Sequence, residues 1–309
     1  MKILVIGGSG FIGSHIVDAA VTAGHRVRVF DRAQPKFHAL PAQVHFMSGS
    51  FSDTAMLSEA VSDVDVVVHS LSTTVPGTSN LNPVADIDGN LIGTVQLLEI
   101  MRAMNAKRLI FLSSGGTVYG IPKTDPVTED HPLRPINSYG IVKTAIEQYL
   151  HMERHLHGLD YAVLRPSNPY GPRQGHGGVQ GVIGTYLWNL ARGEQIQLWG
   201  DGSVVRDFLH VEDLASLTML AIDQGLSGCF NAGSGAGHSI RDVIKCIGQV
   251  VGKELDPAIH PARRIDVPRI VLDIGKVQNA TGWSPTISLS DGVARTWQWV
   301  SQQSNETSP

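Results

Sequence analysis

An apolar run followed at once by a glycine-rich loop constrains the fold of this chain more than any other feature. The run Ile3-Leu4-Val5-Ile6 leads into Gly7-Gly8-Ser9-Gly10-Phe11-Ile12-Gly13, a G-x-x-G-x-x-G spacing. Between a strand and a helix, such glycines let the backbone approach a pyrophosphate at the positive end of the helix. An ordinary glycine-rich turn is less favoured, because a strand-like run precedes the loop and a helix-like segment follows. The predicted dinucleotide contacts are Gly7, Gly10, Phe11, Ile12 and Gly13.

Apolar runs and amphipathic segments alternate through the first half of the chain. The runs span 3–6, 27–30, 44–47, 66–69, 109–112 and 161–164, and the helix-like segments lie near 11–24, 54–61, 86–104 and 138–157. β-branched runs alternating with helices indicate a parallel sheet covered on both faces. We therefore predict an α/β fold with a Rossmann-type doubly wound parallel sheet and a smaller C-terminal α/β domain.

The sequence changes in character after about residue 167, where Pro and Gly become frequent and helix-like segments shorter. We predict a dinucleotide-binding domain over 1–167, with segments near 204–234 returning to it, and a substrate-binding domain over 168–309. The second domain is expected at the carboxyl edge of the sheet, where open α/β sheets bind ligands.

Bulk composition excludes several classes of partner. The 309 residues carry a net charge of −4 without a block of like charges, which argues against nucleic acid and acidic membranes. No run approaches the length of a transmembrane helix, and the N-terminus lacks a signal-peptide pattern. The two cysteines, Cys229 and Cys246, have no metal-ligand spacing. These features predict a soluble cytoplasmic protein without a metal site.

A tyrosine and a lysine four residues apart form the second informative motif, Tyr139-Gly-Ile-Val-Lys143. On a helix the two side chains share one face, and the ammonium can lower the phenol pKa from about 10 towards working pH. A phenolate beside a nicotinamide can then take a proton from an alcohol while hydride leaves. By themselves the two residues could be a core tyrosine and a solvated lysine; the upstream loop favours the catalytic interpretation.

Asp31 ends the second apolar run, about twenty residues after the loop, where an acid can hold an adenosine ribose 2′-OH. A carboxylate there would repel a 2′-phosphate, which favours NAD over NADP. Arg32 follows directly and could reach a phosphate, so it is a second candidate contact.

In the order of its motifs the chain resembles the extended short-chain dehydrogenase/reductase family, and within it the UDP-glucose 4-epimerases and related nucleotide-sugar enzymes. The resemblance covers nearly the whole chain. Besides the two motifs above, the matching segments are Asn90-Leu-Ile-Gly-Thr, Ser113-Ser-Gly-Gly-Thr-Val-Tyr-Gly, Leu164-Arg-Pro-Ser-Asn-Pro-Tyr-Gly-Pro, Gly200-Asp-Gly-Ser-Val-Val-Arg-Asp-Phe, Phe230-Asn-Ala-Gly-Ser-Gly, Arg263-Arg-Ile-Asp-Val-Pro and Gly282-Trp-Ser-Pro.

The resemblance implies an epimerase that inverts C4 of a UDP-hexose by transient oxidation with tightly held NAD. Tyr139 would be the base and would also contact the cofactor, Lys143 would bind the nicotinamide ribose, and Asn90 would contribute to the cofactor site.

The same resemblance implies a UDP-sugar site. Asn168, Arg206 and Arg263 would contact the diphosphate or the sugar, with Arg264 as an alternative to Arg263. Ile270 falls where these epimerases gate bulk at C2 of the hexose. Its intermediate size leaves UDP-glucose, UDP-galactose and their N-acetyl forms open.

Three segments depart from the family pattern. The usual Gly-Asp-Leu or Gly-Asp-Ile after the third strand is Gly49-Ser50-Phe51, which leaves Ser50 and Phe51 as the adenine contacts. The usual His-Leu-Ala-Ala after the fourth strand is His69-Ser-Leu-Ser. The usual Ser or Thr four residues before Tyr119 is Gly115.

The chemistry still needs a donor for the reacting sugar oxygen. Thr117 is the favoured replacement and Ser114 the second, although both could instead satisfy loop backbone groups.

Other activities fit the same motifs less well. A nucleotide-sugar 4,6-dehydratase would need an Asp-Glu pair where this chain has Gly116 and Thr117. A UDP-uronic acid 4-epimerase or decarboxylase stays open, with Arg173 or Arg192 near the sugar C6. An NAD-sensing regulator is disfavoured, because such proteins often lose the Tyr or Lys of the catalytic pair.

The helices near 86–104 and 138–157 carry apolar residues that could form an intersubunit four-helix bundle or cover their own sheet. Examples are Leu97, Met101, Ile146 and Leu150, and amphipathicity does not separate the two readings. Because family members pair these helices, we expect a homodimer.

Overall fold

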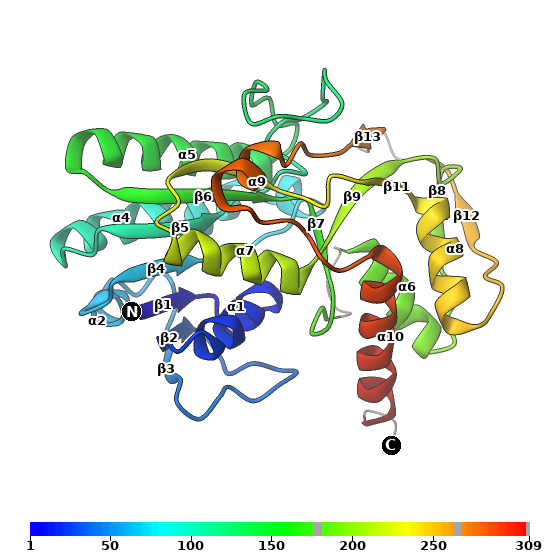
Figure 1. Cartoon of the computed structure of the whole chain (residues 1–309), viewed down its shortest axis with the longest axis horizontal. Helices are drawn as coiled ribbons and strands as arrows, with labels where there is room; N and C mark the ends of the chain where they lie inside the picture. Colours follow the sequence, from blue (N-terminus) through cyan, green and yellow to red (C-terminus); the bar gives the residue numbers. More distant parts are fainter. Residues whose placement is uncertain (176–180, 263–266, 307–309) are drawn as a thin grey trace.

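A seven-stranded parallel sheet organises the first part of the molecule (Figure 1). The computed structural model describes residues 1–175, 181–262 and 267–306. The sheet has the order β10-β6-β5-β4-β1-β2-β3. Its strands are β1 (Lys2–Ile6), β2 (Arg26–Asp31), β3 (His45–Ser48), β4 (Val66–His69), β5 (Arg108–Leu112), β6 (Asp160–Pro166) and β10 (Gly228–Ala232). All six apolar runs overlap one of these strands, so the predicted fold class is confirmed.

Helices cover both faces of this sheet. Successive strand residues point to opposite faces, so Ile3 and Val5 join one hydrophobic core whereas Leu4 and Ile6 join the other. The first core contains α1 (Phe11–Thr22), α7 (Val211–Asp223) and α9 (Gly275–Thr281). The second contains α2 (Thr54–Val61), α4 (Gly93–Ala103) and α5 (Ser138–His157). Three short turns precede α4, namely η1 (Ser79–Leu81), α3 (Pro83–Asp86) and the π-helical η2 (Ile87–Ile92).

The apolar residues named as bundle candidates belong to the second core. Leu97, Met101, Ile146 and Leu150 are each at most 1% exposed and pack with the strands of their own sheet. The interpretation that these four side chains pair between subunits is therefore wrong, because the sheet of their own subunit already covers them.

The second part lies beyond the strand ends and carries smaller sheets (Figure 1). Strands β11 (Gly237–Ser239), β9 (Val205–His210) and β13 (Arg269–Ile270) pair in that order, β7 (Asn168–Tyr170) also pairs with β9, and β12 (Ala258–His260) pairs with β8 (Gln197–Trp199). Its helices are α6 (Val182–Ala191), α8 (Ile240–Val251) and α10 (Leu289–Glu306). Over the described ranges, we find no helix with both the length and the apolar character needed to cross a membrane.

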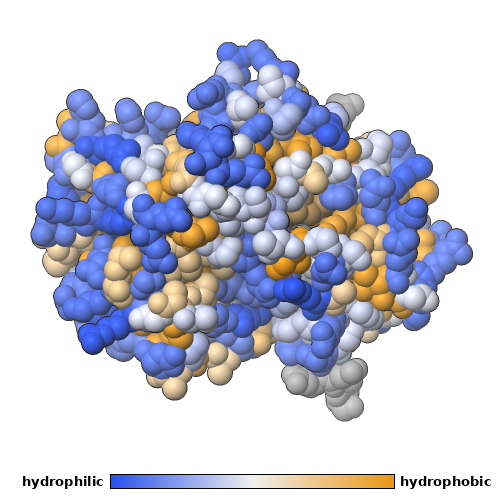
Figure 2. All heavy atoms as spheres, in the orientation of Figure 1, coloured by the Kyte–Doolittle hydropathy of each residue, from blue (hydrophilic) through white to orange (hydrophobic). Residues whose placement is uncertain are grey.

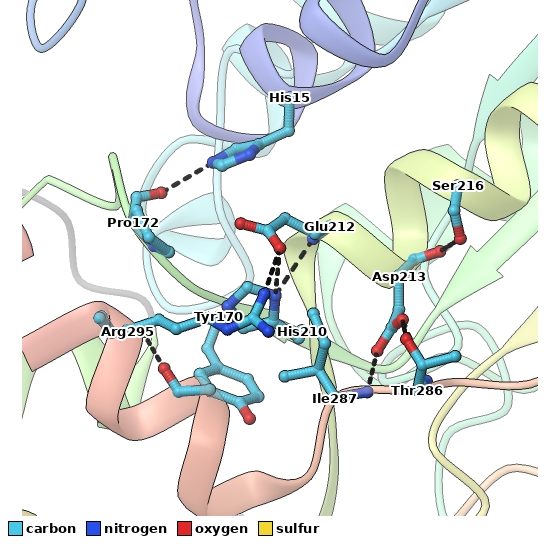
Figure 3. A network of polar contacts seen from close by, with 12 residues as sticks. His15, Tyr170, Pro172, His210, Glu212, Asp213, Ser216, Thr286, Ile287 and Arg295 are labelled. Atoms are coloured by element: carbon cyan, nitrogen blue, oxygen red, sulfur yellow. Dashed lines mark hydrogen bonds and ion pairs between the residues drawn. The ribbon is translucent and has the colours of Figure 1, made fainter. Parts of the chain in front are cut away.

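Polar contacts fix the second part against α1 and α7 (Figure 3). The Nε2 atom of His15 lies 3.0 Å from the Pro172 carbonyl oxygen. Burial lowers the pKa of His15 to about 4, so the ring is neutral at pH 7. Arg295 of α10 pairs with Glu212 in the first turn of α7 at 2.7 Å. The relative position of the two parts is thus set by directional contacts as well as by packing.

Candidate active site

The strand order reverses between β1 and β4, and the loops that follow these two strands meet there. A Cβ atom on Gly7 would lie 2.8 Å from the Leu71 backbone nitrogen, and one on Gly13 would lie 2.8 Å from Ser70 Oγ. Open α/β sheets bind ligands at such a switch point. The glycine-rich loop and the segment after β4 therefore form the floor of the candidate site.

The glycine-rich loop has the geometry that a pyrophosphate requires. Gly7 adopts a φ of +82°, and a Cβ on Gly13 would lie 2.1 Å from the Gly7 carbonyl oxygen. Helix α1 begins after Gly10 and has no acidic residue in its first turn, so the positive end of its dipole is not neutralised by its own residues. The predicted contacts Phe11 and Ile12 form that turn and are half-buried.

Asp31, the predicted contact for an adenosine ribose, lies beside the glycine-rich loop. One carboxylate oxygen accepts the Ser9 backbone N–H at 3.0 Å and the other accepts that of Arg32 at 2.7 Å. A carboxylate has about four lone-pair sites, so both oxygens retain capacity for ribose hydroxyls. The residues at the switch point therefore fit NAD, while the Arg32 side chain is exposed.

The other predicted cofactor residues are Ser50, Phe51 and Asn90, which differ in their exposure to solvent. Ser50 is exposed, and its hydroxyl pairs with that of Ser52 at 2.8 Å. Phe51 is buried in the second core, with its ring centroid 5.2 Å from that of His69. The buried Asn90 accepts the Thr73 N–H at 2.8 Å, so its amide holds the segment that follows β4.

Helix α5 carries the Tyr/Lys pair. The Asn137 side chain caps the helix by accepting the Gly140 N–H at 2.8 Å. Lys143 Nζ lies 5.5 Å from the Tyr139 ring centroid and 4.7 Å from that of Phe111, and it donates to the Leu112 carbonyl at 2.9 Å. The predicted shared face is therefore formed, and the end of β5 orients the ammonium.

Withdrawal from water dominates the ionisation of both groups. Burial raises the pKa of Tyr139 to about 12, a hydrogen bond with the Ser72 side chain opposes this, and the charge of Asp86 adds to it. Burial lowers the pKa of Lys143 to about 8, against the opposing charges of Asp86 and Glu147. The phenol pKa is thus raised by burial, and the prediction that it is lowered towards working pH is wrong for this structure.

The loop after β5 holds the two candidate donors. Ser114 and Thr117 are both buried, and Thr117 Oγ1 has no hydrogen-bond partner among the described residues. The Thr117 carbonyl lies 2.9 Å from where a Cβ on Gly140 would be, which places this loop against the start of α5. An unsatisfied buried hydroxyl costs roughly 1–3 kcal/mol, which a substrate oxygen could offset.

Asn168 and Arg206 line one cavity of about 220 Å³ in the second part, together with Trp199, Tyr186 and Phe208. Hydrophobic atoms gather right of centre in Figure 2, over the second part and where it meets the first. Asn168 Nδ2 donates to the Asp207 carbonyl at 2.9 Å, and Arg206 donates to the Val267 carbonyl at 2.5 Å. An aromatic and apolar pocket with a guanidinium suits a base and its phosphates.

The remaining substrate candidates are Ile270 and Arg263. Ile270 is buried, pairs in register with Arg206, and packs with Val118 and Tyr119 of the loop after β5. Ile270 therefore lies between the loop after β5, which carries Ser114 and Thr117, and strand β9, which carries Arg206. Arg263 and its alternative Arg264 lie outside the described residues.

Sequence reasoning missed three residues of this region. The Ser72 side chain lowers the pKa of Tyr139, the charge of the buried Asp86 raises the pKa of both Tyr139 and Lys143, and Trp199 lines the cavity. The signal for Ser72 was present, because it stands where the family usually has the second Ala of His-Leu-Ala-Ala. Asp86 and Trp199 gave no comparable signal beyond their nearness to matched motifs.

The doubly wound sheet, the glycine-rich loop with Asp31, and the Tyr/Lys face of α5 define a dinucleotide-dependent enzyme of the short-chain dehydrogenase type. The NAD dependent epimerase/dehydratase family matches residues 3–233, and the chain belongs to that family. NAD is accordingly its cofactor.

Relatives match along the whole chain. A putative UDP-glucose 4-epimerase of Methanocaldococcus jannaschii is 35% identical over 96% of this chain and 98% of its own length. The crystal structure of a Thermotoga maritima UDP-glucose 4-epimerase with UDP-glucose is 34% identical with a TM-score of 0.93, covering 98% of this chain and 99% of that one. A Thermus thermophilus UDP-glucose 4-epimerase in complex with NAD is 34% identical with a TM-score of 0.90, covering 97% and 99%.

Proposed function

We propose that this protein inverts C4 of a UDP-hexose, using NAD that it retains through turnover. The observation that carries the proposal is the face shared by Tyr139 and Lys143 on a helix beside the switch point, in a chain similar throughout to UDP-glucose 4-epimerases. The glycine-rich loop and Asp31 would hold NAD, which would supply reversible hydride transfer at C4. No external oxidant is then consumed.

The residues of the chain handle the proton and hold the sugar. Tyr139 as phenolate removes the proton from the C4 hydroxyl and returns it after the keto sugar has turned. Lys143 supplies a positive charge that favours the phenolate when both charges are present. Thr117, with Ser114 as the second candidate, donates to the reacting oxygen.

UDP recognition falls to the second part in this proposal. Trp199 and the apolar walls of the cavity would hold uracil, and Arg206 would contact the diphosphate. Ile270 would restrict the space at C2 and would admit either a hydroxyl or an N-acetyl group. UDP-glucose and UDP-galactose are therefore the first pair to test, and the N-acetyl pair is the second.

The test is product separation after incubation of the purified protein, without added NAD, with each neutral UDP-hexose and with UDP-glucuronate. We expect interconversion of a C4 pair. Two outcomes would contradict the proposal. One is conversion of the uronate with loss of CO₂, and the other is accumulation of protein-bound NADH without an epimer even when NAD is supplied. Either would show that the protein catalyses an oxidation other than C4 epimerisation.

We also propose a homodimer formed through the outer surface of η2 and α5. Ile92, Ile141, Tyr149 and Met152 are large hydrophobic side chains that are 37–55% exposed. The three α5 residues lie on one helical stripe, and α5 packs beside η2. On α5 this stripe is separate from the side that carries the buried Ile146 and Leu150, so one helix can cover its own sheet and meet a partner.

Replacing Ile141 by Glu is expected to convert the dimer to a monomer, because a carboxylate would be buried against the partner's apolar surface. Light scattering at several protein concentrations measures the mass. Ile259→Glu, at an isoleucine that is 74% exposed in the second part, is the matched control. A monomeric parent protein, or a variant that keeps the dimer mass, would place the interface elsewhere.

A further inference from the structure

Trp199 needs support from a neighbouring residue if it is to present a constant surface to a nucleobase. It is the last residue of β8, is half-buried, and lines the cavity that also contains Arg206. A half-buried side chain at a strand end can change rotamer, and each unwanted rotamer would weaken the binding of a base that stacks on the indole. The residues packed against Trp199 therefore affect how well this wall of the cavity is formed.

His260 supplies that support from the neighbouring strand. Strand β12 lies beside β8 at the outer edge of the second part (Figure 1), and their parallel register pairs His260 with Trp199. The two rings stack, with centroids 4.8 Å apart and an angle of 25° between their planes. Stacked rings at this separation attract each other beyond the area that they bury. The imidazole therefore covers one face of the indole and limits its rotation.

A hydrogen bond fixes the plane of the imidazole. His260 Nε2 lies 2.5 Å from Gln197 Oε1, and the imidazole nitrogen is the donor because an amide oxygen only accepts. Gln197 stands two residues before Trp199 on β8, so both side chains lie on one face of the strand. The Gln197 backbone carbonyl accepts the Tyr186 hydroxyl at 2.9 Å. Because a two-stranded sheet has little stability of its own, these side-chain contacts help to fix the position of β8.

We infer that His260 is a positioning residue for nucleotide binding, which holds the Trp199 indole as a stacking platform for a uracil base. Gln197 in turn orients the imidazole. His260 is absent from the described residues that line the cavity, so it acts through Trp199 and without touching the ligand. This role rests on the proposed UDP-hexose epimerisation, and it adds no proton transfer or bond change to that reaction.

Calorimetric titration of the NAD-bound protein with UDP and with inorganic pyrophosphate tests the role without turnover. His260→Ala should raise the Kd of UDP about tenfold, because a poorly held indole loses part of the base-stacking energy. The Kd of pyrophosphate should stay at the parent value, since pyrophosphate has no base and Arg206 lies on another strand. NAD is kept bound so that pyrophosphate does not enter the glycine-rich loop. In turnover, KM for the UDP-hexose should rise by the same factor while kcat is unchanged.

Three further variants separate positioning from a general loss of structure. His260→Phe keeps a ring that can stack and should restore most of the affinity for UDP. Gln197→Leu removes the acceptor that orients the imidazole and should weaken UDP binding by a smaller factor than His260→Ala. His157→Ala, at an exposed histidine that ends α5, is the matched control and should change neither Kd.

Two results with His260→Ala would overturn the inference. One is an unchanged Kd for UDP, and the other is an equal rise in Kd for UDP and pyrophosphate. A parent protein that binds UDP but does not interconvert a C4 pair would contradict the proposed function alone. A parent protein that does not bind UDP would contradict both.

Discussion

Replacing Tyr139 by Phe should lower kcat for C4 interconversion by about 10²–10⁴-fold, the range for loss of a general acid–base group. In the proposed mechanism the phenol takes the C4 proton, and the substitution removes its oxygen with almost no change in side-chain volume. NAD content should stay near that of the parent, because the cofactor loop and Asp31 lie on other elements. Initial rates and cofactor content of purified protein measure both effects.

The raised pKa of Tyr139 also predicts how kcat/KM changes with pH. Burial raises the pKa of Tyr139, so the reactive phenolate is the minor form at neutral pH and kcat/KM of the parent should rise as the pH increases. The residual activity of Tyr139→Phe should lack that rise. Tyr149→Phe, on the same helix with Tyr149 37% exposed, serves as the control and should match the parent. A Tyr139→Phe enzyme that keeps the parent's rate and slope would exclude the phenol as base.

Strand periodicity and the glycine loop were enough to predict the fold. Parallel strands buried on both faces are continuous apolar runs, which is why β1, β4 and β5 were found nearly to the residue. Gly13 was readable for a similar reason, since no larger side chain fits against the Gly7 carbonyl. Both signals are local and depend on residues adjacent in the sequence.

The sequence did not predict the roles of residues that act through contacts with distant parts of the chain. Asp86 lies on a short turn without a motif, and its importance comes from hydrogen bonds to Thr74 and Ser138, 12 and 52 residues away. The direction of Leu97 and Ile146 was also open, because a helix with two apolar stripes has the same period on both. Only the packing against the sheet shows which stripe each residue joins.

Replacing Glu147 by Gln should lower the free energy of unfolding by about 3–5 kcal/mol, the cost of leaving a buried charge without its partner. Glu147 and Arg165 lie 2.6 Å apart, with side chains 2% and 5% exposed. Glu147 also accepts the Ser113 hydroxyl at 2.5 Å, and Arg165 donates to the Tyr119 hydroxyl at 2.9 Å. Denaturant unfolding at fixed NAD concentration measures the change, because cofactor binding itself adds stability.

The loss of unfolding free energy should depend on how deeply the ion pair is buried. The same Glu→Gln substitution in an exposed ion pair tests this dependence. Glu212→Gln breaks the Arg295 pair, whose side chains are 51% and 44% exposed, and should cost no more than about 1 kcal/mol. Changing Glu147 and Arg165 together to Leu and Met should recover part of the loss, since no unpaired charge remains. Equal losses in the two Gln variants would mean that the buried pair is not what holds α5 to β6. Because Glu147 lies one turn beyond Lys143 on the same face, the contacts that stabilise this helix also fix the face that carries Tyr139 and Lys143.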